Sequence, residues 1–362
     1  MIAIIYLDNA STTQVTNAVF SEMLPYMRDS YGNPSSLHSM GKEAKKAINK
    51  AREQVAQAIN AEPNQIFFTS GATEANNWIL SNYNTTLCSR VEHPSIYNHP
   101  NTIKMNDTPL ANQIYRYMPN LVSCMLVNNE TGINYVNGIK SMIEIAHDMN
   151  RPFHIDGTQA YSHLPIDVKW LDVDSFSMSG HKIHTPKGIG VLYLKEPNKY
   201  KPLLYGGGQE KGLRSGTENV AGIVGIGKAC ELYGFSLVDN ANMWKLRNHL
   251  KDFILNNIPD VLINSDENKY SVVPNILSVS FKDIEGESLM LLLDREGICV
   301  SAGSACHSGS LEPSYVLKDL GVPDDYIHGT VRFSFSRLNT IEEIIEVEQK
   351  LKTIVEKLRN IR

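Results

Sequence analysis

A lysine and an aspartate in this chain have the side chains that pyridoxal phosphate (PLP) chemistry requires. Lys182 ends the string Ser179-Gly180-His181-Lys182 after a short apolar stretch, and Asp156 ends an earlier β-like run, residues 153–156. PLP needs an amine for a Schiff base and a carboxylate that keeps its pyridine nitrogen protonated. In a parallel sheet, a carboxylate at the carboxyl end of a strand points into the ligand-binding crevice. Each residue alone is more often a turn or cap residue, but the pair favours a cofactor site.

The string Ser70-Gly71-Ala72-Thr73 lies between a β-rich run, residues 65–69, and a helical stretch. Free N–H groups at a helix N-terminus bind phosphate, and small residues permit its close approach. In isolation, such a junction is more often only a helix cap formed by Thr73. Beside the lysine and the aspartate, it becomes a candidate phosphate site.

One cysteine has the setting of a nucleophile. Cys306 lies among the small residues 301–310, where no apolar neighbour would bury it, and an accessible thiolate is reactive. Free cysteines are usually buried and inert, and we keep that interpretation for the remaining ones, Cys88, Cys124, Cys230 and Cys299. The chain has neither a Cys-x-x-Cys pair nor zinc-type spacing, so we predict no metal site.

Arg332 and His93 are weaker candidates. Arg332 lies in the strand-like run 330–334 among apolar residues, where an arginine commonly pairs with a carboxylate of the protein or of a substrate. His93 precedes Pro94, and a lone histidine is more often structural than catalytic.

Composition limits the class of protein. The 362 residues can bury a sizeable core in about two domains. A formal net charge of −5 does not favour binding to nucleic acid or to an anionic membrane, which prefer a basic face. No apolar run reaches the roughly 18 residues of a membrane helix, and the N-terminus does not resemble a signal peptide. The five scattered cysteines favour reduced thiols in the cytoplasm.

Short apolar runs alternate with helical stretches up to about residue 240. Strands are expected at residues 65–69, 122–127, 153–156, 175–178 and 190–194, and helices at 42–59 and 139–149. This alternation predicts an α/β fold with a largely parallel sheet covered by helices. Later runs at 243–255, 276–281, 288–295, 330–334 and 341–358 lack strict alternation and predict a smaller α+β domain. The proline-containing stretch 94–120 is expected to be the least regular part.

Motifs along nearly the whole chain resemble those of cysteine desulfurases of the NifS/IscS type, in the class V branch of fold-type-I PLP enzymes. The matching segments are residues 6–13, 32–36, 69–76, 127–132, 154–159, 179–182, 206–210, 214–217, 301–310 and 312–317. The resemblance implies a large PLP-binding domain at residues 13–240, with a mostly parallel seven-stranded sheet covered by helices. Residues 1–12 and 241–362 would form a small domain that carries Cys306.

The resemblance also implies roles in cofactor binding. Lys182 would hold PLP and transfer protons, Asp156 would pair with the pyridine nitrogen, and Gln159 would bind the phenolic oxygen. His93 would stack on the ring and assist proton transfer. The residues expected at the phosphate are Ala72, Thr73, Ser179, His181 and, from the other subunit of a homodimer, Thr217.

For the substrate, the resemblance implies L-cysteine, which would be converted to L-alanine with its sulfur left on Cys306 as a persulfide. Asn129, which would also contact the cofactor, and Arg332 would bind the substrate carboxylate, with Asn33 as a weaker candidate. A sulfur-acceptor protein is expected, in iron–sulfur cluster assembly or in the thiolation of tRNA or DNA, and Cys306 could contact a transferred cluster. The alternatives are a selenocysteine lyase, another class V PLP enzyme such as an aminotransferase, and a non-catalytic binding module.

Overall fold

The computed structural model describes residues 4–302 and 313–360, so Cys306 lies outside the described residues. The chain divides into two compact units. The large unit comprises Thr13–Leu126 and Tyr135–Phe235, and the small unit comprises Met1–Thr12, Val127–Asn134 and Ser236–Arg362.

The segment Val127–Asn134 was expected in the large domain, but it belongs to the small unit. Backbone hydrogen bonds explain this grouping. Asn134 N–H donates to Ser271 O over 2.9 Å, Val273 N–H donates to Gly132 O over 2.8 Å, and Ile133 forms a β-bridge with Val272. This pairing joins residues far apart in the sequence, so local patterns could not predict it.

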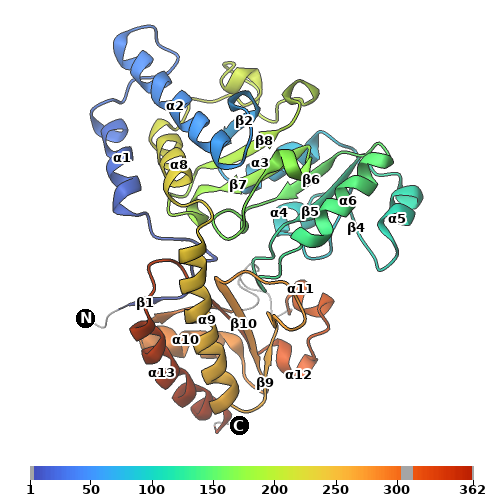
Figure 1. The fold of residues 1–362 in the computed structure, drawn as a ribbon, viewed down its shortest axis with the longest axis vertical. Helices are drawn as coiled ribbons and strands as arrows, with labels where there is room; N and C mark the ends of the chain where they lie inside the picture. The colour runs from blue at the N-terminus through green and yellow to red at the C-terminus, as the bar shows by residue number, and fades with distance from the viewer. Residues whose placement is uncertain (1–3, 303–312, 361–362) are drawn as a thin grey trace. The chain divides into compact units, whose positions relative to one another are not determined.

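Among the described residues, the large unit is built on a seven-stranded sheet in the order β2-β8-β7-β6-β5-β3-β4 (Figure 1). Its strands are β2 (Ile66–Thr69), β3 (Thr86–Cys88), β4 (Thr102–Lys104), β5 (Leu121–Met125), β6 (Phe153–Asp156), β7 (Ser175–Ser179) and β8 (Gly190–Leu194). Within this sheet β8 runs antiparallel to both neighbours, and the other pairings are parallel. The predicted α/β fold with a mostly parallel sheet is confirmed.

Helices complete the large unit. They are α1 (Asn17–Arg28), α2 (Ser39–Ala58), α3 (Ala72–Ser81), α4 (Pro94–Tyr97), α5 (Leu110–Tyr117), α6 (Val136–Asp148), α7 (Val168–Leu171), α8 (Val220–Leu232) and the short 3-10 turns η1 (Pro63–Gln65), η2 (Gly180–Lys182), η3 (Pro197–Lys199) and η4 (Glu210–Gly212). Every residue of β5, β6, β7 and β8 is buried, as expected for strands covered on both faces. Helices α2 and α8 pack so closely that a Cβ on Gly227 of α8 would lie 2.7 Å from Ala51 Cα of α2, and glycine is needed at this position.

The stretch 94–120 is more regular than expected. It contains α4, β4 and α5. Two of its prolines lie at helix starts, since Pro94 is the first residue of α4 and Pro109 immediately precedes α5. Proline is favoured at the first helical position, which Pro94 occupies, because its fixed φ suits the first turn and its missing N–H costs nothing there.

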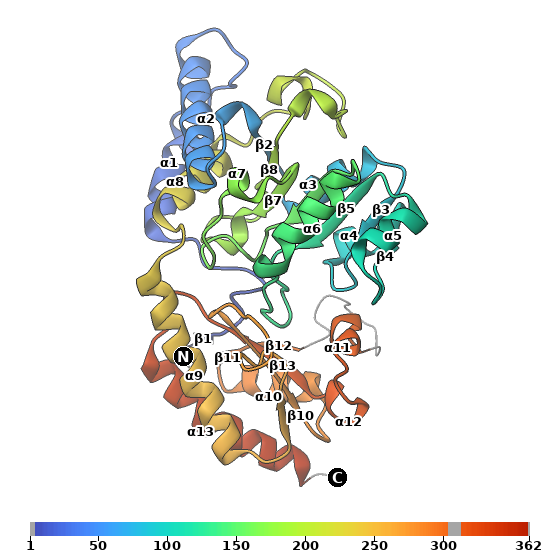
Figure 2. The same cartoon turned by 45° about the vertical axis from the view of Figure 1, so that its right-hand side comes forward.

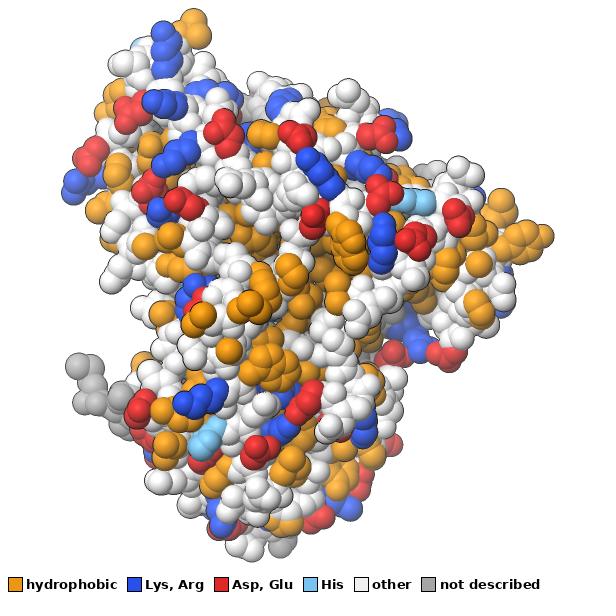
Figure 3. Space-filling model, in the orientation of Figure 1, with side chains coloured by type: hydrophobic (Ala, Val, Ile, Leu, Met, Phe, Trp, Pro, Cys, Tyr) orange, Lys and Arg blue, Asp and Glu red, His pale blue; other side chains and the backbone are white. Residues whose placement is uncertain are grey.

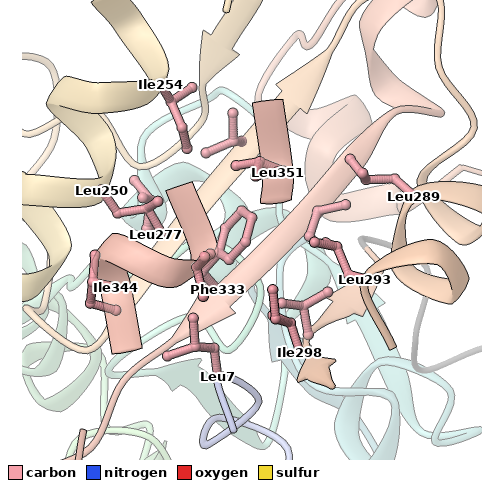
Figure 4. Close-up of a cluster of buried hydrophobic side chains, with 14 of the residues drawn as sticks. Leu7, Leu250, Ile254, Leu277, Leu289, Leu293, Ile298, Phe333, Ile344 and Leu351 are labelled. Carbon is pink, nitrogen blue, oxygen red and sulfur yellow. The ribbon is translucent and has the colours of Figure 1, made fainter. Parts of the chain in front are cut away.

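The small unit has a four-stranded sheet, β12-β13-β10-β9, and a two-stranded pair, β1-β11, within the described residues. Its elements are β1 (Ile5–Tyr6), α9 (Leu237–Asn257), β9 (Val261–Ile263), β10 (Ile276–Phe281), α10 (Gly286–Arg295), β11 (Ile298–Cys299), β12 (Ser301–Ala302), α11 (Tyr315–Asp319), α12 (Asp324–Ile327), β13 (Thr330–Ser334) and α13 (Ile341–Arg359). Helices α9 and α13 lie side by side (Figure 2). Figure 4 shows the core that they cover, where Leu7, Leu277 and Phe333 meet Leu250 and Leu351.

On the face shown in Figure 3, acidic and basic side chains are intermingled, and hydrophobic side chains gather over α5, where Tyr115 is 81% exposed.

Within residues 4–302 and 313–360, no single helix is long and apolar enough to span a membrane. The two helices α8 and α9, which form a bent pair, meet those criteria only when they are taken together.

Candidate active site

Asp156 ends β6 and is almost completely buried, with 4% of its surface exposed. Its carboxylate is held from two sides: Asn76 Nδ2 on α3 donates to Oδ2 over 2.8 Å, and Thr158 N–H donates to Oδ1 over 2.9 Å. Each contact supplies a donor to one carboxylate oxygen, so the orientation of the carboxylate is fixed. The sequence prediction identified Asp156 but missed Asn76, although its spacing of three from Thr73 places both on one face of a helix.

His93 precedes α4, and Asp156 acts on it electrostatically. Its Nδ1 caps α4 by accepting from Ser95 N–H over 3.1 Å, and it lies 2.9 Å from Ser95 Oγ. Burial lowers the pKa of His93; Asp156 opposes this shift, and the positive charge of Lys182 adds to it. The ring is therefore neutral near pH 7 and can exchange a proton at Nε2, the nitrogen that does not cap the helix.

Lys182 lies in η2, immediately after β7, the parallel neighbour of β6 (Figure 1). A tight turn positions it, because a Cβ on Gly180 would lie 2.2 Å from Thr185 Oγ1. Thr13 holds the turn from outside: its N–H and hydroxyl both donate to His181 O, over 2.8 and 2.9 Å. Adjacent parallel strands thus bring Lys182 and Asp156 to the same edge of the sheet, as the sequence predicted.

Three of the residues predicted at the phosphate, Ala72, Thr73 and Ser179, lie at the N-terminus of α3. Gly71 precedes the helix, and Ser179 Oγ is the nearest atom that a Cβ there would meet, at 4.0 Å. A Cβ on Gly190 would lie 2.6 Å from Gly71 Cα, so glycine is required where β8 approaches. Ala72 is the first helical residue, and Thr73 is exposed in the single chain. Ser179 is thereby brought to the helix start.

His181 supplies an unsatisfied polar atom in the same turn. Its Nδ1 is buried and has no hydrogen-bond partner among the described residues. Burial first, and then the positive charges of Lys182 and Lys187, lower the pKa of His181 to about 4. A buried donor or acceptor without a partner is costly, so a group that completes this atom's hydrogen bonding fits here.

A partly buried ion pair balances charge near the same helix end. Glu74, in the first turn of α3, accepts from Arg214 Nε over 2.7 Å and from Arg214 Nη2 over 2.9 Å, and it also accepts from Ser70 N–H over 2.8 Å. This fork-shaped pairing ties the segment around Arg214 to the start of α3. The sequence motifs contained both residues without indicating that they pair.

Three other predicted site residues of the large unit, Gln159, Asn33 and Thr217, differ in how much of their surface is exposed. Gln159 is buried, with 6% of its surface exposed. Asn33 and Thr217 are exposed, and the side chain of Asn33 accepts from Ser35 N–H in a local turn. Within the described residues of the single chain, neither Asn33 nor Thr217 forms a hydrogen bond or an ion pair with Asp156.

Arg332 and Asn129 belong to the small unit. The Arg332 guanidinium donates to Asp8 Oδ1 over 3.0 Å, to Ser11 Oγ over 2.6 Å and to the backbone oxygen of Asn129 over 2.5 Å. The expected pairing of this arginine with a carboxylate is therefore present, with Asp8 as the partner. Its buried Nε has no partner among the described residues.

The neighbouring Glu130 was not predicted from the sequence. Burial raises its pKa to about 7, partly offset by a hydrogen bond from Ser314 and by the charge of Arg332. Ser314 Oγ donates to Glu130 Oε2 over 2.6 Å and also caps α11. This contact ties the start of α11 to the segment Val127–Asn134.

Glu92, beside His93, makes the stability of the fold depend on pH. It is fully buried, and it accepts from Met125 N–H over 2.7 Å and from Ser89 Oγ over 3.0 Å. Burial, and then the charge of Asp156, raise its pKa from 4.5 to about 8. The folded form therefore keeps a proton that the unfolded form releases, so stability present below pH 4.5 is lost as pH rises toward 8.

We expect Glu92→Gln, which is neutral at every pH, to remove this loss. The unfolding free energy of Glu92→Gln minus that of the wild type should increase between pH 5 and pH 8 with a slope of up to about 1.4 kcal/mol per pH unit. Urea unfolding at several pH values measures this difference. A difference that stays constant or declines with pH would contradict a protonated Glu92.

Comparisons with known proteins agree with this geometry. A family model described as aminotransferase class-V matches residues 5–347. The chain is 42% identical to the cysteine desulfurase IscS of Methanosarcina thermophila, over 99% of this chain and 93% of that protein. A solved NifS-like protein superposes with a TM-score of 0.87 at 33% identity, covering 98% of this chain and 100% of the other.

A further solved structure, SspA in complex with cysteine, superposes with a TM-score of 0.77 at 29% identity, covering 92% of this chain and 99% of the other. The family match and the full-length relatives confirm the resemblance that the motifs indicated. The chain belongs to the class V aminotransferase family and, within it, to the cysteine desulfurases of the NifS/IscS type.

Proposed function

We propose that this cysteine desulfurase binds PLP in the large unit and uses it to take sulfur from L-cysteine, releasing L-alanine. The observation that carries the proposal is the arrangement of Lys182 and Asp156 at the ends of the adjacent parallel strands β7 and β6, with His93 electrostatically coupled to both. When bound, PLP supplies an electron sink that weakens the bond between the substrate's β-carbon and its sulfur.

The large-unit residues fit this cofactor chemically. Asp156 is a buried carboxylate that can pair with a protonated ring nitrogen, and the α3 N-terminus with Ser179 can bind a phosphate. The unpartnered Nδ1 of His181 is a further polar contact for a ligand in this turn. Gln159 is proposed to bind the phenolic oxygen, and Ala72 and Thr73 to bind the phosphate.

Proton transfer is assigned to Lys182 and His93. The Lys182 amine attaches the cofactor and then moves a proton at the substrate's α-carbon. His93 is neutral near pH 7 because burial lowers its pKa, so it can accept or donate a proton at Nε2. Arg332 is proposed to bind the substrate carboxylate together with Asn129, since its buried Nε has no partner within residues 4–302 and 313–360. Asn33 is a weaker proposal for the same role.

The sulfur step is assigned to Cys306. Its thiolate attacks the substrate sulfur, an S–S bond forms, and the bond from that sulfur to the β-carbon breaks. The electron pair left on carbon takes a proton and becomes the methyl group of alanine. Cysteine plus a thiol therefore gives alanine plus a persulfide, and the balance requires no external oxidant or reductant.

Two further proposals concern the subunit assembly of the enzyme and the acceptor of the sulfur. A homodimer in which Thr217 reaches the partner subunit's phosphate is supported by the exposure of Thr217 in the single chain. The persulfide is proposed to pass to an acceptor protein in iron–sulfur cluster assembly or in nucleic-acid thiolation. A cytoplasmic location remains the prediction made from the scattered cysteines.

Product analysis tests the proposed reaction. Protein loaded with PLP and given L-cysteine with a thiol reductant is expected to form alanine and sulfide in equal amounts. An aminotransferase would instead convert cysteine to its 2-oxo acid, without alanine or sulfide from the same molecule. Competition with selenocysteine distinguishes a selenocysteine lyase, which would prefer selenocysteine at equal concentrations.

A further inference from the structure

Asn76 connects the two groups expected on the cofactor ring. Its Nδ2 lies 2.8 Å from Asp156 Oδ2 and 3.0 Å from Ser95 Oγ, and Ser95 Oγ lies 2.9 Å from His93 Nδ1. Its Oδ1 lies 3.0 Å from Nε2 of the buried His154. Asn76 itself has no solvent-exposed surface. One amide on α3 thus contacts two other elements, β6 through Asp156 and His154 and α4 through Ser95.

The chemistry of the partners fixes the orientation of this amide. Asp156, as a carboxylate, only accepts hydrogen bonds, so the NH2 group must face it; the reversed amide would oppose two oxygens. The second hydrogen of the NH2 group then points to Ser95 Oγ. The remaining oxygen then accepts from His154 Nε2, and the other ring nitrogen of His154, Nδ1, lies 2.9 Å from Ser175 Oγ, whose hydroxyl can donate to it. Every hydrogen-bonding atom of the amide has a complementary partner.

The same logic determines where the proton of His93 lies. Ser95 Oγ accepts from Asn76, so its hydroxyl hydrogen is free to donate to His93 Nδ1, which also accepts from Ser95 N–H. The neutral ring of His93 must then carry its proton on Nε2. The titratable groups that act on this network are Glu92, His93, His154, Asp156 and Lys182.

We propose that Asn76 is a positioning residue that orients the Asp156 carboxylate and, through the Ser95 hydroxyl, reinforces the Ser95 N–H bond that keeps the His93 proton on Nε2. The inference rests on the proposed function, because these two side chains are the ones assigned to the cofactor ring. It adds a residue that touches neither the reacting atoms nor the substrate. Without Asn76, Asp156 would retain Thr158 N–H as a donor, and Ser95 would lose the partner that orients its hydroxyl.

The test replaces Asn76 with leucine, which is similar in size and lacks the amide. Histidine 15N NMR of the full-length protein without PLP reports which ring nitrogen carries the proton, independently of turnover. We expect the wild type to show His93 protonated on Nε2. In Asn76→Leu the Ser95 hydroxyl loses the donor that orients it and can accept from Nδ1, so a fraction of His93 protonated on Nδ1 should appear although Ser95 N–H still favours Nε2. The dissociation constant for PLP should rise about tenfold or more, because the charged Asp156 loses a buried donor.

Asn82→Leu is the matched control. Asn82 caps the other end of α3, where its Nδ2 donates to Trp78 O over 2.9 Å and to Lys201 O over 3.1 Å. It should lower stability while leaving the His93 signals and PLP affinity within about twofold of the wild type. Ser95→Ala is the second variant: it removes the hydroxyl contact but keeps the backbone N–H donor to His93 Nδ1, so it should shift the Nδ1 signal while the proton stays on Nε2. It should weaken PLP binding less than Asn76→Leu, because Asp156 keeps its donor. In the double variant, the effects on the His93 signals should not add.

Unchanged His93 signals together with unchanged PLP affinity in Asn76→Leu would overturn the proposal. So would equal changes in Asn82→Leu, which would indicate general loosening of α3. If Asn76→Leu fails to fold, Ser95→Ala tests by itself whether the Ser95 hydroxyl acts on His93. Unaltered His93 signals in Ser95→Ala would refute that role. A wild type that binds no PLP would instead refute the proposed function, while the His93 signals would still report on Asn76.

Discussion

Lys182→Ala is expected to lower alanine formation from L-cysteine by at least about a thousandfold. The residue is assigned two tasks, attachment of the cofactor and proton transfer, and alanine can perform neither. General acid–base catalysis alone typically contributes about a hundredfold to ten-thousandfold. The glycine-dependent turn at Gly180 and the bonds from Thr13 hold the backbone of η2 without the Lys182 side chain, so the fold should persist.

The measurement combines visible absorbance with alanine assay. The wild type loaded with PLP should be yellow, and Lys182→Ala should lose this colour after dialysis. Lys199→Ala is the control, because Lys199 is exposed and paired with Glu196, away from the cofactor residues. Full colour and full turnover in Lys182→Ala would contradict the assignment of this lysine.

Cys306→Ser is expected to keep the yellow colour and to lose alanine and sulfide formation by about a thousandfold or more. A serine hydroxyl is a poor nucleophile toward sulfur and cannot form a stable persulfide. PLP binding should persist because Lys182, Asp156 and the residues proposed to bind the phosphate belong to the large unit. Cys306 lies outside the described residues, so this prediction depends on its sequence setting and on the family.

Cys299→Ser provides the matched control. Cys299 is a free cysteine in β11, and burial, followed by the charges of Asp294 and Asp8, raises its pKa. It is therefore mostly protonated near neutral pH, and its replacement should change turnover by less than about twofold. Normal turnover in Cys306→Ser, or loss of turnover in Cys299→Ser, would show that the sulfur is carried elsewhere.

Local sequence patterns were reliable where a single element determines a residue's setting. The strand ends at Asp156 and before Lys182 were predicted from short apolar runs, and the structure has β6 and β7 at those places. The short strands β3 and β4 were missed, because three residues carry too little periodicity to be recognised. The helix starts at Pro94 and after Pro109 were predicted as irregular, although proline is favoured at the first helical position, which Pro94 occupies.

By itself, the sequence determined the α/β fold, through local periodicity, and the family, through its motifs; it also predicted which residues would hold a cofactor and accept sulfur. Periodicity and motifs can be read from each segment alone. The tertiary structure alone decided that Asn76 joins Asp156 to Ser95, that Glu92 is buried beside Met125, and that residues 127–134 belong to the small unit. Each of these depends on hydrogen bonds between distant segments, and the partner of a buried polar group is chosen when the elements pack together.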